Sequence, residues 1–470
     1  MIFLFQLSSI AAAEKEDGKN WLITCEDETQ TGIALTVYNN NLGLVKDQRS
    51  MSIPKGIGEI RFMDVAADII PASVSIKSIV KPDSLNILEQ NYEYDLLSPG
   101  KLLDKFVGKE IKLYQKNPYT EREEVVTATL LANNEKPVFQ IGNEITFNHP
   151  GRIIFPSVPE NLISKPTLVW LAENNLRDEQ KVEVSYLTEG INWQSDYVLI
   201  LNEKDDAADL SGWVTIDNKS GTTYKNAKLK LVAGDVNKVE RKVRRKGAVF
   251  MAADIAEAAP QFKEEGFFEY HIYTLQRPAT VKDNQTKQIN LITAEGIKVK
   301  KEFRFSSNNY NYFDSDPGFG GEQKVKVFIE IANRKENNLG IPLPKGIIRT
   351  YKGDTEGSLQ FIGEDSINHT PENEKITIKI GEAFDVVGER KQTDWRKLAN
   401  DTYESAYEIT LRNHKKEDIT VKVTEPIPGD WTIILSSHEY KKPDASTAEF
   451  NINVPNDGEA KLIYRVRVRQ

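Results

Sequence analysis

Apolar and polar residues alternate from Ile33 to the carboxyl terminus, and this alternation limits the folds that the chain can adopt. Clear examples are SVSIKSI at 73–79, KVEVSYL at 181–187 and KITIKI at 375–380. Successive side chains of a β-strand point to opposite faces, so each segment predicts a strand with one buried face and one wet face. Turn signals such as NDG at 456–458 separate the strands at short intervals. The pattern predicts a mainly β protein of antiparallel sandwiches or barrels.

Three strands share a local design in which an asparagine ends the strand in phase with its apolar positions. They are VTID before Asn218, IEIA before Asn333 and ITLR before Asn413. An asparagine at such a position can hydrogen-bond the backbone of the turn that follows. We interpret the repetition as several immunoglobulin-like β-sandwich units in series. The alternative is a frequent hairpin pattern without duplication.

The length of 470 residues corresponds to about three domains. After a signal-like segment at 1–13, we predict an N-terminal β domain at 26–160, a central β domain at 161–325 and a C-terminal β-sandwich region at 326–470. Within the last region, residues 402–470 form the best candidate for a complete immunoglobulin-like sandwich.

Two segments interrupt the pattern of sandwiches. Residues 98–156 read as a short helix followed by four or five short strands, which is the outline of a small SH3-like or Sm-like barrel. Ser98 and Pro99 are interpreted as the N-cap and first residue of that helix. Residues 240–265 contain the basic run RKVRRK and an alanine-rich stretch. They predict a flexible loop with a short helix.

The amino-terminal sequence MIFLFQLSSIAAA favours export, because an apolar run precedes small residues of the kind found at signal cleavage sites. It lacks the basic residues that usually begin a signal peptide, and a first strand is the alternative. The expected location is the periplasm, the cell surface or the secreted fraction. No later apolar run approaches the roughly 20 residues of a membrane span, so no transmembrane span is expected. The 70 acidic residues outnumber the 61 basic ones, so no nucleic-acid partner is expected.

Several distinctive strings carry a resemblance to a known family. They include NWQSDY and GEDSINHT, and the strings occupy 35–45, 192–197, 227–236, 269–275, 284–287, 363–370 and 384–392. From about Ile33 to Gln470 the chain resembles the bacterial family of the domain of unknown function 4139. Its carboxyl-terminal part is similar to the mucoidy-inhibitor proteins. The resemblance implies an exported, mostly β protein and implies no catalytic residues.

The chain has few residues that could form disulfides or bind metals through sulfur or imidazole, with one cysteine and five histidines. One cysteine forms no internal disulfide, and no two histidines have a chelating spacing, so no metal and no cofactor is expected. One segment is distinctive enough to carry candidate ligand-binding residues: Tyr270, His271, Tyr273, Arg277, Asn284 and Lys287. In a strand, His271 and Tyr273 share a face and either act on a ligand or hydrogen-bond within the sheet. The charge run 389–391, with His414, predicts a solvated face or an interdomain ion-pair set.

These observations favour a non-catalytic, exported or envelope-associated protein that acts through protein or glycan contacts. The expected partner is an envelope protein or a glycan. The alternative is a hydrolase that acts on envelope polymer or peptide at a domain junction. A further alternative, a nucleic-acid binder that uses the barrel and the basic loop, conflicts with export.

Overall fold

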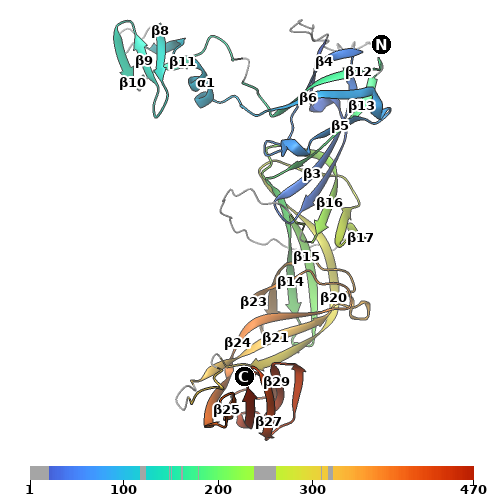
Figure 1. Ribbon diagram of the computed structural model, residues 1–470, viewed down its shortest axis with the longest axis vertical. Helices are drawn as coiled ribbons and strands as arrows, with labels where there is room; N and C mark the ends of the chain where they lie inside the picture. The colour runs from blue at the N-terminus through green and yellow to red at the C-terminus, as the bar shows by residue number, and fades with distance from the viewer. Residues whose placement is uncertain are drawn as a thin grey trace. The chain divides into compact units, whose positions relative to one another are not determined.

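The computed structural model describes residues 21–116, 123–147, 149, 151–159, 162–177, 179–234, 236–237, 261–307, 310–315 and 321–470. The signal-like segment at 1–13 and residues 240–260 of the predicted loop lie outside the described residues. The described chain is mainly β and contains a single α-helix, which confirms the predicted fold class (Figure 1).

The chain divides into two compact units, and each is discontinuous in sequence. Unit 1 comprises the described parts of Met1–Asn192, Asp217–Val232 and Thr274–Thr286. Unit 2 comprises those of Trp193–Ile216, Ala233–Tyr273 and Lys287–Gln470.

Two sheets of unit 1 follow the alternating pattern read from the sequence. The first has the order β1-β4-β12-β6, with the bounds Leu22–Cys25, Gly56–Met63, Thr167–Asn174 and Leu85–Glu93. The other contains the path β16-β2-β3-β13-β5, with the bounds Tyr224–Ala233, Gln30–Tyr38, Leu42–Ser52, Glu179–Thr188 and Ser75–Ser78. The short strand β19 (Ala279–Val281) pairs with β16. Along β13, Val182, Val184 and Tyr186 are buried and alternate with more exposed residues, as a half-wet strand requires.

A further sheet of unit 1 matches the predicted helix and strands at 98–156. Its order is β10-β9-β8-β7-β11, with the bounds Glu144–Phe147, Val138–Ile141, Glu123–Ala132, Glu110–Lys116 and Arg152–Ile154. The helix α1 (Pro99–Phe106) begins as predicted, because the Ser98 side chain accepts a hydrogen bond from the backbone N–H of Lys101. The described strands do not close into a barrel. β11 has only three residues and pairs with β7, while β10 pairs with β9 alone, so the sheet stays open.

Unit 2 is built on one long path of strands. Its order is β23-β22-β14-β15-β20-β21-β24-β25-β30-β27, with the bounds Leu359–Ile367, Gly346–Gly353, Ile191–Leu201, Ala207–Asn218, Gln285–Phe305, Gln323–Ala332, Lys375–Lys397, Thr402–Asn413, Gly458–Arg469 and Asp430–Ser436. A second layer at the carboxyl-terminal end contains β26 (Ile419–Pro426), β29 (Thr447–Val454) and β28 (Tyr440–Asp444), and β26 also pairs with β20. A hairpin of β17 (Phe262–Phe267) and β18 (Tyr270–Leu275) completes the described strands. The short 3-10 helices are η1 (Asp27–Thr29), η2 (Pro71–Ser73), η3 (Pro82–Ser84) and η4 (Lys335–Asn337).

In unit 2, β20, β21 and β24 run side by side (Figure 1). Residues of these strands belong to two hydrophobic cores. The first core contains Ile297 of β20, Ile329 of β21 and Ile378 of β24. The second core contains Phe303 of β20 and Val386 of β24, together with the inward residues of β25, β26, β29 and β30. Since the same strands enter both cores, the carboxyl-terminal sandwich shares its core with residues that precede 402.

The three strand-ending asparagines hydrogen-bond their turns, which confirms the prediction made for them. Asn218, Asn333 and Asn413 are all fully buried. In each, the side-chain amide donates to backbone carbonyls of two different segments, and its oxygen accepts an N–H of the turn. The structure adds a fourth case, Asn174 at the end of β12, which donates to three carbonyls. The repeated motif therefore ties the ends of strands together in both units.

The charge run at 389–391 is not uniformly solvated, because Arg390 faces the carboxyl-terminal core. Its Nε donates to Glu425 Oε2 at 2.9 Å, and its guanidinium carbon lies 3.7 Å from the centre of the Tyr407 ring. Tyr312 also donates to Glu425 Oε2 at 3.1 Å, and so does Tyr464. Burial first, and the charge of Glu425 second, raises the pKa of Tyr464 well above its ordinary value. Burial raises the pKa of Tyr312 in the same way, so both hydroxyls stay protonated donors, and the sandwich core encloses the pair of Arg390 and Glu425. Of the two alternatives predicted for this run, the solvated face is wrong for Arg390 and the ion pair is present, because strand alternation turns Arg390 away from its charged neighbours and toward Glu425.

Candidate functional site

The predicted ligand-binding residues are divided between the two units. Tyr270, His271 and Tyr273 lie on β18 in unit 2. Lys287 also belongs to unit 2, on β20. The other two, Arg277 and Asn284, belong to unit 1 and are exposed in the turns that flank β19. The structure brings three of the six together on one strand, and they remain candidate ligand-binding residues.

The side chains on β18 make contacts within their own unit. His271 Nδ1 lies 2.7 Å from Glu264 Oε1 across the β17–β18 hairpin. Tyr273 is buried, donates to the backbone oxygen of Pro342 at 2.8 Å and packs edge-on against Trp193. Burial raises the pKa of the Tyr273 hydroxyl far above its ordinary value. Tyr273 therefore supports the fold, and His271 is the more accessible of the two.

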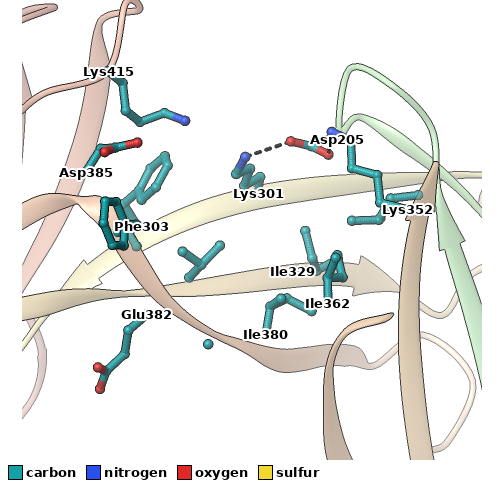
Figure 2. Close-up of a pocket in the computed structure, with 15 residues that line it drawn as sticks. Asp205, Lys301, Phe303, Ile329, Lys352, Ile362, Ile380, Glu382, Asp385 and Lys415 are labelled. Carbon is teal, nitrogen blue, oxygen red and sulfur yellow. Dashed lines mark hydrogen bonds and ion pairs between the residues drawn. The ribbon is translucent and has the colours of Figure 1, made fainter. Parts of the chain in front are cut away.

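The described part of unit 2 contains a pocket at the place where its two cores meet, which we call the junction pocket. Its volume is about 260 Å³. The floor is aliphatic, and Figure 2 shows Ile329, Ile362 and Ile380 grouped there. Ile329 belongs to the first core and Phe303, on the opposite side, to the second. Residues of both cores therefore line the pocket.

One wall of the junction pocket is a group of two lysines around one aspartate, the Lys–Asp–Lys triad of Lys301, Asp205 and Lys352. Lys301 Nζ lies 2.7 Å from Asp205 Oδ2, and Lys352 Nζ contacts Asp205 Oδ1 (Figure 2). Burial alone would raise the pKa of Asp205, but the hydrogen bonds and charges of the two lysines outweigh burial and hold its pKa below the ordinary value. Asp205 is therefore ionised, and the triad carries one excess positive charge.

Local sequence explains the position of the aspartate. The turn between β14 and β15 is organised by Asn202, whose side-chain oxygen accepts the backbone N–H groups of Asp206 and Ala207. Asp205 adopts a left-handed backbone conformation with φ of 59°, which aspartate tolerates better than most residues. The sequence of this segment predicts a turn. The lysine partners of Asp205 come from β20 and β22, which are far away in sequence.

The opposite side of the junction pocket carries Lys415, Asp385 and Phe384. Lys415 Nζ lies 5.9 Å from the centre of the Phe303 ring and 3.1 Å from Glu417 Oε1. Phe384 is 87% exposed although it is a large aromatic residue. Lys324 Nζ donates to the Phe384 backbone oxygen and lies 5.3 Å from its ring. The pocket thus combines an aliphatic floor with charged walls and one exposed aromatic ring.

Sequence comparison shows that the part of the chain that forms this pocket matches a known family. The model of the family described as Domain of unknown function (DUF4139) matches residues 182–469, which is more than half of the chain. The chain belongs to the DUF4139 family. Every residue that lines the junction pocket falls inside the matched region. The resemblance drawn for residues 33–181 and the similarity to mucoidy-inhibitor proteins stay predictions. No curated protein sequence matches the chain.

Two further findings concern the described residues of this DUF4139 protein. No helix in the described part of the chain is long and apolar enough to cross a membrane. No group of three or more histidine, cysteine, aspartate or glutamate side chains in the same residues is arranged to hold a metal ion.

Glu302 follows Lys301 on β20 and faces the other side of the sheet. Its ion pairs should make the free energy of unfolding depend on pH. Its carboxylate lies 2.7 Å from both Lys300 Nζ and Arg304 Nη2. Burial opposes ionisation, but these cations and Lys422 lower its pKa from 4.5 to about 2. A folded-state pKa below the unfolded value stabilises the fold above pH 4.5, and this contribution is lost as the pH falls from 4.5 to about 2.

We expect Glu302→Gln to lower the free energy of unfolding at pH 7 by about 2 kcal/mol and to have a much smaller effect at pH 2. Urea unfolding at the two pH values checks this. Glu417→Gln is the control, because Glu417 is 64% exposed and its removal should change little at either pH. Equal losses for Glu302→Gln at both pH values would contradict the assignment.

Proposed function

We propose that this protein is a non-catalytic, exported and envelope-associated binding protein that holds a protein or glycan partner at the junction pocket. The observation that carries the proposal is the exposed ring of Phe384 at the rim of a pocket with an aliphatic floor. Exposing a large aromatic side chain forgoes the free energy of its burial, and such residues act as anchors at binding surfaces. The charged walls beside it supply groups that orient a partner.

The proposed location rests on the amino-terminal sequence. The apolar segment at 1–13 ends in small residues, which favours cleavage on export. A periplasmic, surface or secreted location would place the junction pocket among envelope proteins and polymers.

We expect Phe384→Ala to abolish retention of the partner when the tagged protein is purified from its native envelope. The matched control is Phe268→Ala, because Phe268 is 86% exposed in the β17–β18 hairpin of the same unit and is remote in sequence from the pocket. Quantitative mass spectrometry should show one component lost from the Phe384→Ala preparation and kept in the control. Equal retention in the two variants would remove the pocket from the proposed function.

A further inference from the structure

Three lysines and three acidic residues line the junction pocket, and the wall formed by the Lys–Asp–Lys triad is the part with a cationic excess. In the Lys–Asp–Lys triad, two ammonium groups share one carboxylate. Each ammonium has three N–H donors. Lys352 uses one donor on Asp205 and another on the backbone oxygen of Glu203, at 2.9 Å. Lys301 uses one on Asp205. Donors therefore exist on the pocket wall for one further anionic oxygen pair.

The aromatic ring of Phe303 places the cations near the apolar surface. Lys301 Nζ lies 5.6 Å from the centre of this ring, and Lys415 Nζ lies 5.9 Å from it. Figure 2 shows Lys415 extending over the pocket toward Lys301, while the Glu382 carboxylate points away from the cavity. Lys415 thus faces the triad from the opposite side of the cavity, where Asp385 also lies.

The aliphatic floor determines what kind of anion fits. Ile329, Ile362 and Ile380 offer methyl and methylene groups and no hydrogen-bond partner. An inorganic anion would leave this apolar surface exposed to water. An aliphatic body would bury it, which contributes a favourable free energy of about 25 cal/mol per Å². A carboxylate also accepts hydrogen bonds from ammonium groups in the geometry that the triad already uses for Asp205.

We propose that the junction pocket binds a carboxylate attached to an aliphatic body, with the carboxylate on Lys301 and Lys352 and the body on the isoleucine floor. The proposal rests on the proposed binding function and names the chemistry of its ligand. Two sources carry this chemistry, the carboxyl terminus of a peptide that ends in apolar residues and a free fatty acid.

Calorimetric titration of the full chain with defined probes tests the proposal. The peptide probe is N-acetyl-Ala-Ile-Ile as the free acid, with the carboxyl-terminal amide of the same peptide as its uncharged partner. Decanoate and decanol form the second pair. We expect at least one acid to bind about tenfold or more tightly than its uncharged partner, because a charge-assisted hydrogen bond is lost without the carboxylate.

Variants assign that preference to the triad. Lys301→Gln and Lys352→Gln each leave Asp205 one lysine partner, and each should reduce the preference for the acid to near unity. Lys300→Gln is the matched control, because Lys300 precedes Lys301 on the same strand but pairs with Glu302. The control should keep the wild-type preference.

The outcomes separate the sources and the two proposals. A preference for the acid peptide assigns a peptide terminus, and a preference for decanoate alone assigns a fatty acid. Equal binding of acid and uncharged probes, absence of binding for all of them, or a preference that survives in both triad variants would overturn the carboxylate proposal. Partner retention that still depends on Phe384 would then leave the binding function standing with another ligand.

Discussion

Arg390→Met is expected to lower the free energy of unfolding of the carboxyl-terminal sandwich by about 3–5 kcal/mol, because it leaves the fully buried Glu425 without its cation. The hydroxyls of Tyr312 and Tyr464 would still donate to the carboxylate, but neither supplies a charge. Urea unfolding of the purified variant measures the loss.

A double variant shows whether the ion pair itself stabilises the fold, or whether the loss in the single variant comes only from leaving a buried charge unpaired. Replacing both members with apolar residues, Arg390→Met with Glu425→Leu, should recover most of the lost stability, because no uncompensated charge remains. The pair of Arg467 and Glu404 provides the control, because its arginine is exposed and the Glu404 carboxylate keeps Arg465 Nη1 at 3.8 Å when Arg467 is replaced. Arg467 is 53% exposed, so Arg467→Met should cost less than about 1 kcal/mol. A loss below about 1 kcal/mol for Arg390→Met alone would contradict the requirement of Glu425 for its cation.

Asn413→Ala is expected to destabilise the same sandwich by about 3 kcal/mol, since three backbone groups lose their partners at once. The amide of Asn413 donates to Glu417 and Pro455 backbone oxygens, and its oxygen accepts the Lys415 N–H at 3.0 Å. All of this takes place at a fully buried position. Thermal and urea unfolding measure the effect.

Asn413→Asp separates hydrogen bonding from side-chain volume. Aspartate keeps the size and the acceptor but replaces the donor with an oxygen that faces carbonyl oxygens, so it should destabilise at least as much as alanine. Asn451→Ala is the control, because Asn451 is exposed on β29 of the same sandwich, and its effect should stay within about 0.5 kcal/mol. Tolerance of Asn413→Asp would contradict the role given to the amide donor.

Much of the fold was predictable from residue pattern, because a strand repeats every two residues and its turns are marked locally. The alternation at 181–187 lies in β13, and the asparagines at 218, 333 and 413 do at strand ends what their phase predicts. Asn174 was missed, although it ends its strand in the same way.

The junction pocket was not predictable, because residues far apart in the sequence come together only in the folded chain. Asp205 is 96 residues from Lys301 and 147 residues from Lys352, and taken alone it indicates a charged hairpin tip. Arg390 alternates correctly with its neighbours, but its partner Glu425 lies 35 residues further along. Phe384 lies in a stretch where the pairing of β24 with β21 shifts register twice, so simple alternation does not predict which face it takes.

Site-specific photo-crosslinking in the native envelope tests the binding function most directly. A photoreactive phenylalanine analogue is placed at position 384 in one preparation and at position 268 in another, where the natural side chains are almost equally exposed. We expect a crosslinked partner from position 384 that is absent from position 268 and is lost when the carboxylate probe that binds best is added in excess. A partner captured equally from both positions, or none from position 384, would contradict the assignment of the junction pocket as the binding site.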